Sequence, residues 1–415
     1  MKLSVSRLLS RACLLVSLAA STAQAQVVYV SASAPAGGDG SSWSSAFQSL
    51  ADGLAFASFG DRVFVAEGVY RPDQGSFKTL GDREETFKLS EGVSIYGGFV
   101  GTESDPLLRE GSAAATILTG DLNGDDLPGF TNRGDNSYHV VRGRGITSLT
   151  VIDGFTIQGG NADGGATEPV GGGIYNASLC SPTVRDCTIR DNRASDSGGG
   201  VANRLSSSPV FENCVIEDNY AEIGGGGWYD FQNGAPILSG VSFLRNESGS
   251  LGGGAYSLSN CTPSFMDCVF EENYAAGNGG AYRNEFSSLP SFDECTFTGN
   301  VAGDFAGALD NDGMTYTLRG CEFVNNVSGL DGGGVRTTAD MSFVACTWID
   351  NQAGAKGGAI VCTELSATLT VLRCLIRGNS AVESGGGIHM TANLFMENSA
   401  LTQNSAGTDG AAICL

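Results

Sequence analysis

The sequence contains little positive charge and almost no histidine. Its 415 residues include 23 Lys and Arg, 45 Asp and Glu and 2 His, for a formal net charge of −22. So acidic a surface repels nucleic acid and anionic membranes, and neither is an expected partner. With His139 and His389 as the only histidines, a Ser/His or Cys/His catalytic centre is not expected. His139 lies in an apolar stretch and is interpreted as an ordinary strand residue.

Long apolar runs and paired metal-binding cysteines are also missing. The apolar run near the N-terminus, Ala12 to Ala20, is too short to span a bilayer. It follows three basic residues and precedes an Ala-x-Ala sequence that ends at Ala25, which predicts that residues 1–25 are a Sec signal peptide. The mature chain is therefore expected to be exported, and to be secreted, at the cell surface or associated with the outer membrane. No C-x₂-C pair occurs, which argues against a zinc site.

The most abundant feature of the sequence is a repeat of about 27 residues. The phrase Cys-Thr-Ile-Arg-Asp-Asn at 187–192 recurs in related forms, and its closing Asn returns at steps of 25 to 28 residues. A glycine-rich cluster follows each closing Asn at a fixed distance. Such a period indicates a stacked array, because one unit cannot bury its apolar face alone. The closing residues are Asn192, Asn219, Asn246, Asn273, Asn300, Asn326, Asn351, Asn379 and Asn404.

The repeat unit has the composition of a strand. It is rich in β-branched and aromatic residues, lacks a helical period, and is divided by Gly and Pro at fixed places. Gly and Pro in register predict corners between short strands. We therefore predict an all-β fold, a single-stranded right-handed parallel β-helix (a solenoid) with three corners per turn. Successive turns would stack at the usual strand spacing of about 4.8 Å.

Stacking converts the repeat into columns of equivalent residues. Ile189, Phe243 and their counterparts form an inward apolar column, and seven cysteines from Cys187 to Cys374 form another. The closing asparagines are predicted to form a structural ladder, because a buried amide can bond to the amides above and below it. The cysteines are expected to be buried free thiols, because parallel neighbours on one face rarely offer the dihedral angle of a disulfide. A second polar column contains Asn176, Asn203, Asp230, Ser257, Asn284 and Asn311.

The residues before the regular repeat are predicted to form two further regions. In residues 26–70, apolar residues from Phe47 to Ala55 follow helical spacing, which predicts an N-terminal cap with a capping helix. A helix there would protect an otherwise open sheet edge. Residues 71–150 are predicted to form irregular first coils with long loops, and residues 151–415 the regular coils.

The sharpest polar cluster in the sequence lies between Asp121 and Asp126. Asp121, Asn123 and Asp125 alternate like the first ligands of a calcium loop. Asp126 stands where an EF-hand requires Gly, so we predict a looser oxygen-rich calcium site that includes Asp126 instead. A solvated acidic turn is the alternative interpretation. The sequence indicates no other cofactor.

Three tyrosines suggest a site for sugars. Tyr175, Tyr229 and Tyr256 occupy one outward column beside the glycine corner, and exposed rings in a row can stack on sugars. We predict that these rings bind glycan. The alternative is that they are ordinary exposed aromatic residues on a strand.

The repeat also resembles that of known protein families. Trp348-Ile-Asp-Asn351, followed by Gly357-Gly-Ala-Ile360, is similar to the repeat of the chlamydial polymorphic outer-membrane proteins. More broadly, residues 150–415 resemble the right-handed β-helix repeat proteins of the pectin-lyase-like superfamily. This resemblance implies the β-helix fold. It also implies that an enzyme of this kind would cleave acidic polysaccharides with calcium-bound carboxylates and a basic residue, or with clustered carboxylates.

The expected function is that of an exported, non-enzymatic protein of the cell envelope or surface. Its long side would serve adhesion or glycan binding, with a polysaccharide or a cell-surface protein as partner. The first alternative is a polysaccharide lyase or glycoside hydrolase. A spatial cluster of three carboxylates with an Arg or Lys on one face would favour it. The second alternative is a purely structural rod.

Overall fold

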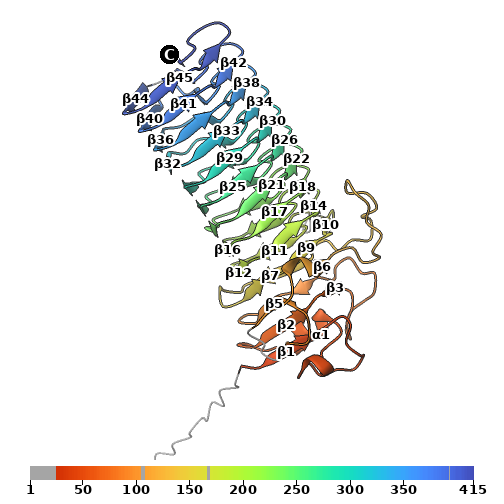
Figure 1. The fold of residues 1–415 in the computed structure, drawn as a ribbon. Helices are drawn as coiled ribbons and strands as arrows, with labels where there is room; N and C mark the ends of the chain where they lie inside the picture. The colour runs from red at the N-terminus through yellow and green to blue at the C-terminus, as the bar shows by residue number, and fades with distance from the viewer. Residues whose placement is uncertain (1–24, 104–107, 166–168, 392) are drawn as a thin grey trace, which may run out of the picture.

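The protein forms a long rod of stacked coils, as the computed structural model in Figure 1 shows. The structure describes residues 25–103, 108–165, 169–391 and 393–415. Apart from Ala25, the predicted signal peptide lies outside these residues. No helix in the described ranges is long and apolar enough to cross a membrane.

Four stacks of parallel strands run along the rod, and each is named here after its first strand. The β1 sheet has thirteen strands, and every pairing in it is parallel. Its strands are β1 Val27–Val30, β2 Arg62–Ala66, β5 Ser94–Phe99, β8 Val151–Asp153, β12 Thr183–Arg185, β16 Val210–Glu212, β20 Ile237–Ser239, β24 Ser264–Met266, β28 Ser291–Asp293, β32 Tyr316–Arg319, β36 Met341–Val344, β40 Thr368–Leu372 and β44 Asn393–Glu397.

The β3 sheet has twelve strands and carries the predicted inward apolar column. Its strands are β3 Gly68–Tyr70, β6 Thr116–Thr119, β9 Thr156–Gln158, β13 Thr188–Arg190, β17 Val215–Glu217, β21 Ser242–Leu244, β25 Val269–Glu271, β29 Thr296–Thr298, β33 Glu322–Val324, β37 Thr347–Ile349, β41 Leu375–Arg377 and β45 Ala400–Thr402.

The β4 sheet also has twelve strands and follows the glycine corners. Its strands are β4 Phe87–Lys88, β7 Val141–Arg144, β11 Ile174–Ala177, β15 Val201–Arg204, β19 Trp228–Phe231, β23 Ala255–Leu258, β27 Tyr282–Glu285, β31 Leu309–Asn311, β35 Val335–Thr337, β39 Ile360–Cys362, β43 Ile388–Met390 and β47 Ile413–Cys414.

The fourth stack, the β10 sheet, was not predicted. It consists of ten strands of two residues, which follow directly after the Asn position of each coil. Two residues are too few to show the alternation by which a strand is identified in a sequence. Its strands are β10 Asn161–Ala162, β14 Arg193–Ala194, β18 Tyr220–Ala221, β22 Glu247–Ser248, β26 Tyr274–Ala275, β30 Val301–Ala302, β34 Val327–Ser328, β38 Gln352–Ala353, β42 Ser380–Ala381 and β46 Ser405–Ala406.

The inward apolar column stacks ring on ring, as predicted. Phe243 pairs in register with Phe270, and their ring centroids lie 4.6 Å apart with planes 6° from parallel. The stack continues through Phe297 and Phe323 to Trp348, all fully buried. Burial of each such side chain stabilises the fold by roughly 1.5–3 kcal/mol. The core is therefore one continuous column along the rod.

The closing asparagines form one hydrogen-bonded ladder. Asn273 Nδ2 donates to Asn300 Oδ1 at 2.9 Å, and the backbone N–H of Asn273 donates to the same oxygen at 3.0 Å. The second Nδ2 proton reaches the carbonyl oxygen of Phe243 at 2.9 Å. The same pattern repeats from Asn192 to Asn404. Each buried amide is thereby satisfied, which a buried polar group requires.

The second polar column forms a similar series of bonds, in which Asp230 is the one carboxylate. Asn203 Nδ2 donates to Asp230 Oδ1 at 2.9 Å, and Ser257 Oγ donates to Asp230 Oδ2 at 3.3 Å. Asp230 is fully buried, and this burial raises its pKa from 3.8 to about 7. Asp230 therefore occupies a position whose neighbours suit an amide side chain, although its own side chain can ionise.

The eleven cysteines among the described residues are all unpaired, and every one except Cys414 is buried. Cys187 Sγ lies 3.1 Å from the carbonyl oxygen of Arg185, and burial raises the pKa of Cys187 to about 12. Such a thiol is protonated at neutral pH and acts as a small apolar filler.

The N-terminal end contains the one α-helix of the described chain, α1 Leu50–Phe56, and two short 3₁₀ turns, η1 Trp43–Ser45 and η2 Ala113–Ala115. Ser49 Oγ caps α1 by accepting hydrogen bonds from the N–H groups of Ala51 and Asp52. Leu50 and Leu54 join the same core as Val28 of β1. That α1 protects the sheet edge stays a prediction.

Replacement of Asn273 by Ala is expected to destabilise the protein by about 1–3 kcal/mol, because it leaves Asn246 and Phe243 without their partners. The measurement is the free energy of unfolding in denaturant. Glu271→Ala, an exposed substitution in the same coil, is the matched control and should change it little. Equal unfolding free energies for the two variants would contradict the role of the ladder.

Asp230→Asn is expected to change how stability depends on pH. Between the unfolded pKa near 3.8 and the folded pKa of about 7, the folded chain holds a proton that the unfolded chain has lost. Stability should therefore fall as pH rises through this window, by a total on the order of 4 kcal/mol. The Asn variant should lack this fall and be the more stable protein at pH 8. Parallel curves of Tm against pH for the two proteins would contradict the assignment.

Candidate functional site

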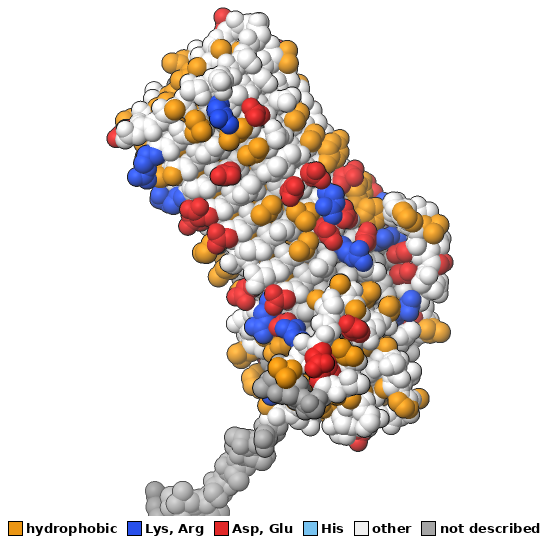
Figure 2. Space-filling view, in the orientation of Figure 1, with side chains coloured by type: hydrophobic (Ala, Val, Ile, Leu, Met, Phe, Trp, Pro, Cys, Tyr) orange, Lys and Arg blue, Asp and Glu red, His pale blue; other side chains and the backbone are white. Residues whose placement is uncertain are grey.

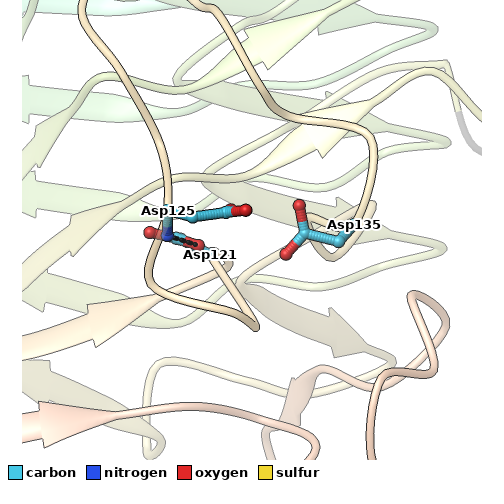
Figure 3. A group of neighbouring side chains, drawn as sticks. All are labelled: Asp121, Asp125 and Asp135. Carbon is cyan, nitrogen blue, oxygen red and sulfur yellow. Dashed lines mark hydrogen bonds between the residues drawn. The ribbon is translucent and has the colours of Figure 1, made fainter.

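An acidic loop after β6 brings three carboxylates together. Single oxygens of Asp121, Asp125 and Asp135 lie within 4.8 Å of one another. Figure 3 shows Asp135 facing the other two across the loop. Asp121 Oδ1 accepts hydrogen bonds from the N–H groups of Gly124 and Asp125, at 2.7 and 3.2 Å. The loop thus holds a set of oxygen ligands that suits a hard cation such as Ca²⁺.

This cluster differs from the predicted ligand set. Asp121 and Asp125 belong to it, but Asp126 turns to Arg133 and to Asn136, whose Nδ2 donates to Asp126 Oδ2 at 2.9 Å. Burial raises the pKa of Asp126. Asp126 Oδ1 has no hydrogen-bond partner, and the assignment of Asp126 as a ligand stays a prediction.

Asn123 contributes to the loop through its backbone. Its N–H group donates to Asp135 Oδ2 at 3.0 Å, which helps to hold Asp135 against the other two carboxylates. Asp135 was not predicted as a ligand, because Asp135 lies beyond the alternating acidic stretch of residues 121–126. The only available signal was a further acidic residue in the same loop.

A large hollow lies beside α1, and we call it the N-terminal cleft. It has a volume of about 1020 Å³ and lies between α1 and the loop of residues 71–80. Ser49 Oγ donates to the carbonyl oxygen of Gln74, and Asp52 Oδ1 accepts from the N–H group of Ser76 at 2.7 Å. A side chain at Gly75 would meet Ser49 and Asp52, so glycine permits this close approach. The loop is thus fixed against the first turn of α1.

Apolar and polar side chains alternate around the N-terminal cleft. Phe77, Leu80 and Phe56 line it and are 94, 80 and 51% exposed. Asp73 lines it as well but is only 3% exposed; its Oδ2 accepts from the N–H group of Gly81, whereas its Oδ1 has no partner. A buried carboxylate oxygen without a partner is costly unless a ligand or water supplies a donor.

Arg71 connects the N-terminal cleft to the acidic loop. It lines the cleft, and its Nε donates to the carbonyl oxygen of Asp121 at 2.8 Å. The cleft and the three carboxylates are therefore neighbours, although they lie 50 residues apart in the sequence at this contact.

The predicted glycan-binding tyrosines are buried, so the expectation of an exposed column is wrong. Tyr175, Tyr229 and Tyr256 are only 6, 7 and 4% exposed, and they form a small second core on the outer face of the β4 sheet. Val170 and Leu251, from the preceding corners, pack against them. These neighbouring segments cover the column, which the strand pattern alone does not reveal. The rings offer no exposed face for a sugar.

Farther along the same outward column lies a group of five charged residues, here called the charged cluster. It consists of Arg283, Glu285, Asp310, Asp312 and Arg336. Arg283 contacts all three carboxylates, and Arg336 Nη1 lies 2.8 Å from Asp310 Oδ1. Asp310 is fully buried, whereas Asp312 is 47% exposed.

The charged cluster is the feature that the sequence analysis named as favouring an enzyme. The strand register places Arg283, Asp310 and Arg336 side by side, although 26 or 27 residues separate them in the chain. Two arginines pair with three carboxylates, so one negative charge of the cluster is left uncompensated. The cluster therefore resembles a structural ion-pair network as much as a catalytic centre.

Of the two histidines only His389 lies on a strand; His139 lies two residues before β7, so its prediction as a strand residue is wrong. His139 is 3% exposed, and its ring lies 4.7 Å from that of Tyr175. His389 on β43 has its Nδ1 3.0 Å from Ser384 Oγ, and burial lowers the pKa of His389. Ser384 is only 7% exposed, so this pair offers no accessible nucleophile.

The acidic loop is expected to bind Ca²⁺, because an ion would relieve repulsion among its three carboxylates. Asp135→Asn should weaken binding at least tenfold, whereas Glu271→Gln, which changes an exposed carboxylate on β25, should leave it nearly unchanged. The measurement is calorimetric titration of residues 26–415 with CaCl₂, together with the rise in Tm. No heat of binding and no rise in Tm at millimolar Ca²⁺ would indicate a solvated acidic turn.

Comparison with known proteins relates the repeat to one family model. Residues 130–323, just under half of the chain, match the model described as a right handed beta helix region. No curated protein sequence matches the chain significantly. The resemblance to the chlamydial polymorphic outer-membrane proteins stays a prediction.

Three solved structures illustrate the similarity of the chain to known folds, and the similarity is distant. Pectate lyase Pel9A has 11% identity and a TM-score of 0.39, with 92% of this chain and 79% of that chain covered. The catalytic unit of the GH87 α-1,3-glucanase from Streptomyces thermodiastaticus has 14% identity and a TM-score of 0.44, with 92 and 69% covered. The GH136 lacto-N-biosidase from Eubacterium ramulus has 13% identity and a TM-score of 0.35, with 94 and 68% covered. The chain is thus a right-handed parallel β-solenoid whose residues 130–323 match the right-handed β-helix family model.

Proposed function

We propose that the protein is an exported glycan-binding β-helix protein of the cell envelope or surface, and that its N-terminal cleft holds a polysaccharide. The observation that carries the proposal is a set of exposed apolar side chains that lines one open cleft next to Asp73, whose buried Oδ1 has no partner. A sugar presents apolar C–H faces and hydroxyl donors, which match these two kinds of surface.

The charge of the protein supports a neutral glycan over an acidic one. The net charge is −22, and within the cleft Asp52 and Asp73 balance Arg71 and Lys78. On the face shown in Figure 2, Lys and Arg side chains lie in small groups mixed with Asp and Glu, and uncharged surface separates these groups. A long polyanion would find no continuous basic track on this face.

A second candidate function is the cleavage of a polysaccharide at the charged cluster. Three carboxylates and two arginines meet there on one face, and paired carboxylates can act as acid and base on a glycosidic bond. Binding without cleavage is the preferred proposal, because Arg283 pairs with Glu285, Asp310 and Asp312 alike. The purely structural rod is the third candidate.

The test is retention of residues 26–415 on immobilised neutral polysaccharides, with polygalacturonate as the acidic comparison. The double variant Phe77→Ala/Asp73→Asn should bind at least tenfold more weakly, because it removes an apolar contact of roughly 1.5–3 kcal/mol and the free acceptor. Phe59→Ala is the matched control, since Phe59 is 67% exposed but does not line the cleft.

The same incubations separate the candidate functions. Retention with the polysaccharide left at full length supports a binding protein. Shortened polysaccharide, lost in Asp312→Asn, would replace the proposal with the enzyme. Retention on no polysaccharide would contradict both and favour the rod.

A further inference from the structure

A second hollow runs along one corner of the rod, and we call it the corner groove. It has a volume of about 670 Å³ and is lined by two residues from each of four successive coils, just after β11, β15, β19 and β23. At about 4.8 Å per coil, the four levels span roughly 14 Å along the rod. The lining pairs are Ser178-Leu179, Leu205-Ser206, Gln232-Asn233 and Ser259-Asn260.

The backbone of the corner groove is strained in a systematic way. All eight lining residues have positive φ, between 55° and 67°. The next coil continues the corner with Phe286 and Ser287, at 48° and 64°. Among the described residues, two consecutive non-glycine residues with positive φ occur only at this corner. Each such residue costs roughly 1–2 kcal/mol relative to a right-handed conformation.

Glycine would remove this strain, and the chain uses glycine at comparable positions elsewhere. Gly225 and Gly252, for example, have φ of 61° and 56° at the glycine corner of successive coils. The corner groove instead keeps side chains at every level. Single non-glycine residues with positive φ also occur at other corners, for example Asp267 and Glu294, but only this corner has consecutive pairs of them. This doubled strain at every level points to a role for the side chains themselves.

The chemistry of the corner groove is uncharged. Its side chains offer hydroxyl groups, amides and two leucines, and Leu179 and Leu205 are 68 and 47% exposed. The ring of Phe286, one coil farther on, is 70% exposed. The corner therefore combines apolar contact surface with neutral hydrogen-bonding groups along one line.

The main chain of the corner is not available to a ligand strand. The N–H group of Leu205 donates to Phe231, that of Asn233 to Ser259, and equivalent bonds join the other levels. A peptide could not add a strand to the sheet here, so a ligand would have to contact the side chains. The lack of Lys and Arg in the lining also disfavours a nucleic acid or another polyanion.

We propose that the corner groove binds an extended neutral polysaccharide chain parallel to the rod axis. Successive sugars meet equivalent amide and hydroxyl groups at successive coils, and Phe286 stacks on a sugar at one end. The corner groove shares no residue with the N-terminal cleft, so this proposal is tested independently of the proposed function. With both sites, one rod would hold a long glycan at two places.

The test uses a substitution that removes side chains without straining the fold. The groove variant Gln232→Gly/Asn233→Gly/Ser259→Gly/Asn260→Gly places glycine where φ is already positive. The control variant Asp267→Gly/Glu294→Gly does the same at another corner, where φ is 51° and 53°. Binding of gluco-, xylo- and mannohexaose to residues 26–415 is measured by calorimetry, and folding by circular dichroism and Tm.

The expected result is binding of at least one hexasaccharide that is at least tenfold weaker in the groove variant and unchanged in the control variant. Phe286→Gly should weaken the same interaction, also without unfolding. All affinities are compared in proteins that also carry the cleft substitutions Phe77→Ala/Asp73→Asn, so that sugar bound in the N-terminal cleft does not hide a loss at the groove. Equal affinity of the folded groove variant and its cleft-substituted parent, or no binding of any hexasaccharide by that parent, would overturn the proposal.

Discussion

Hydrogen bonding between equivalent positions of successive coils is the constraint on which the rest of the structure depends. The backbone strands bond coil to coil, and the Asn ladder adds buried side-chain bonds in the same direction. A shift of one residue in any coil would break both sets at once and would turn the apolar column toward solvent. Three kinds of interaction therefore fix the register of each coil: the main-chain hydrogen bonds, the Asn ladder and the stacking of the aromatic rings.

This constraint explains which features could be predicted from the sequence. The Asn ladder and the Phe column must recur at nearly constant spacing, so their period of 25 to 28 residues is visible in the chain itself. The β-helix follows from that period together with Gly and Pro at the corners. The two-residue β10 sheet was missed because so short a strand leaves no alternation to detect.

The candidate sites were less predictable, because they depend on contacts outside the repeat. Tyr229 has the spacing of an outward residue, but Leu251 from a corner covers it. Asp135 joins Asp121 only through the fold of one loop. The N-terminal cleft exists because residues 71–80 fold back on α1, and that loop follows no period. In this protein, periodic positions are predictable, and positions set by irregular loops are not.

The Asn ladder has a direction as well as a period. From Asn192 onward each Nδ2 donates one of its protons to the Asn of the coil that follows, so the amide-to-amide bonds all run the same way along the rod. Each level offers an oxygen to the coil before it and a donor to the coil after it. The rod can thus change length only by whole coils that keep this polarity. Removal of residues 247–273, for instance, would join Asn246 to Tyr274 and leave every remaining amide with a correctly oriented neighbour.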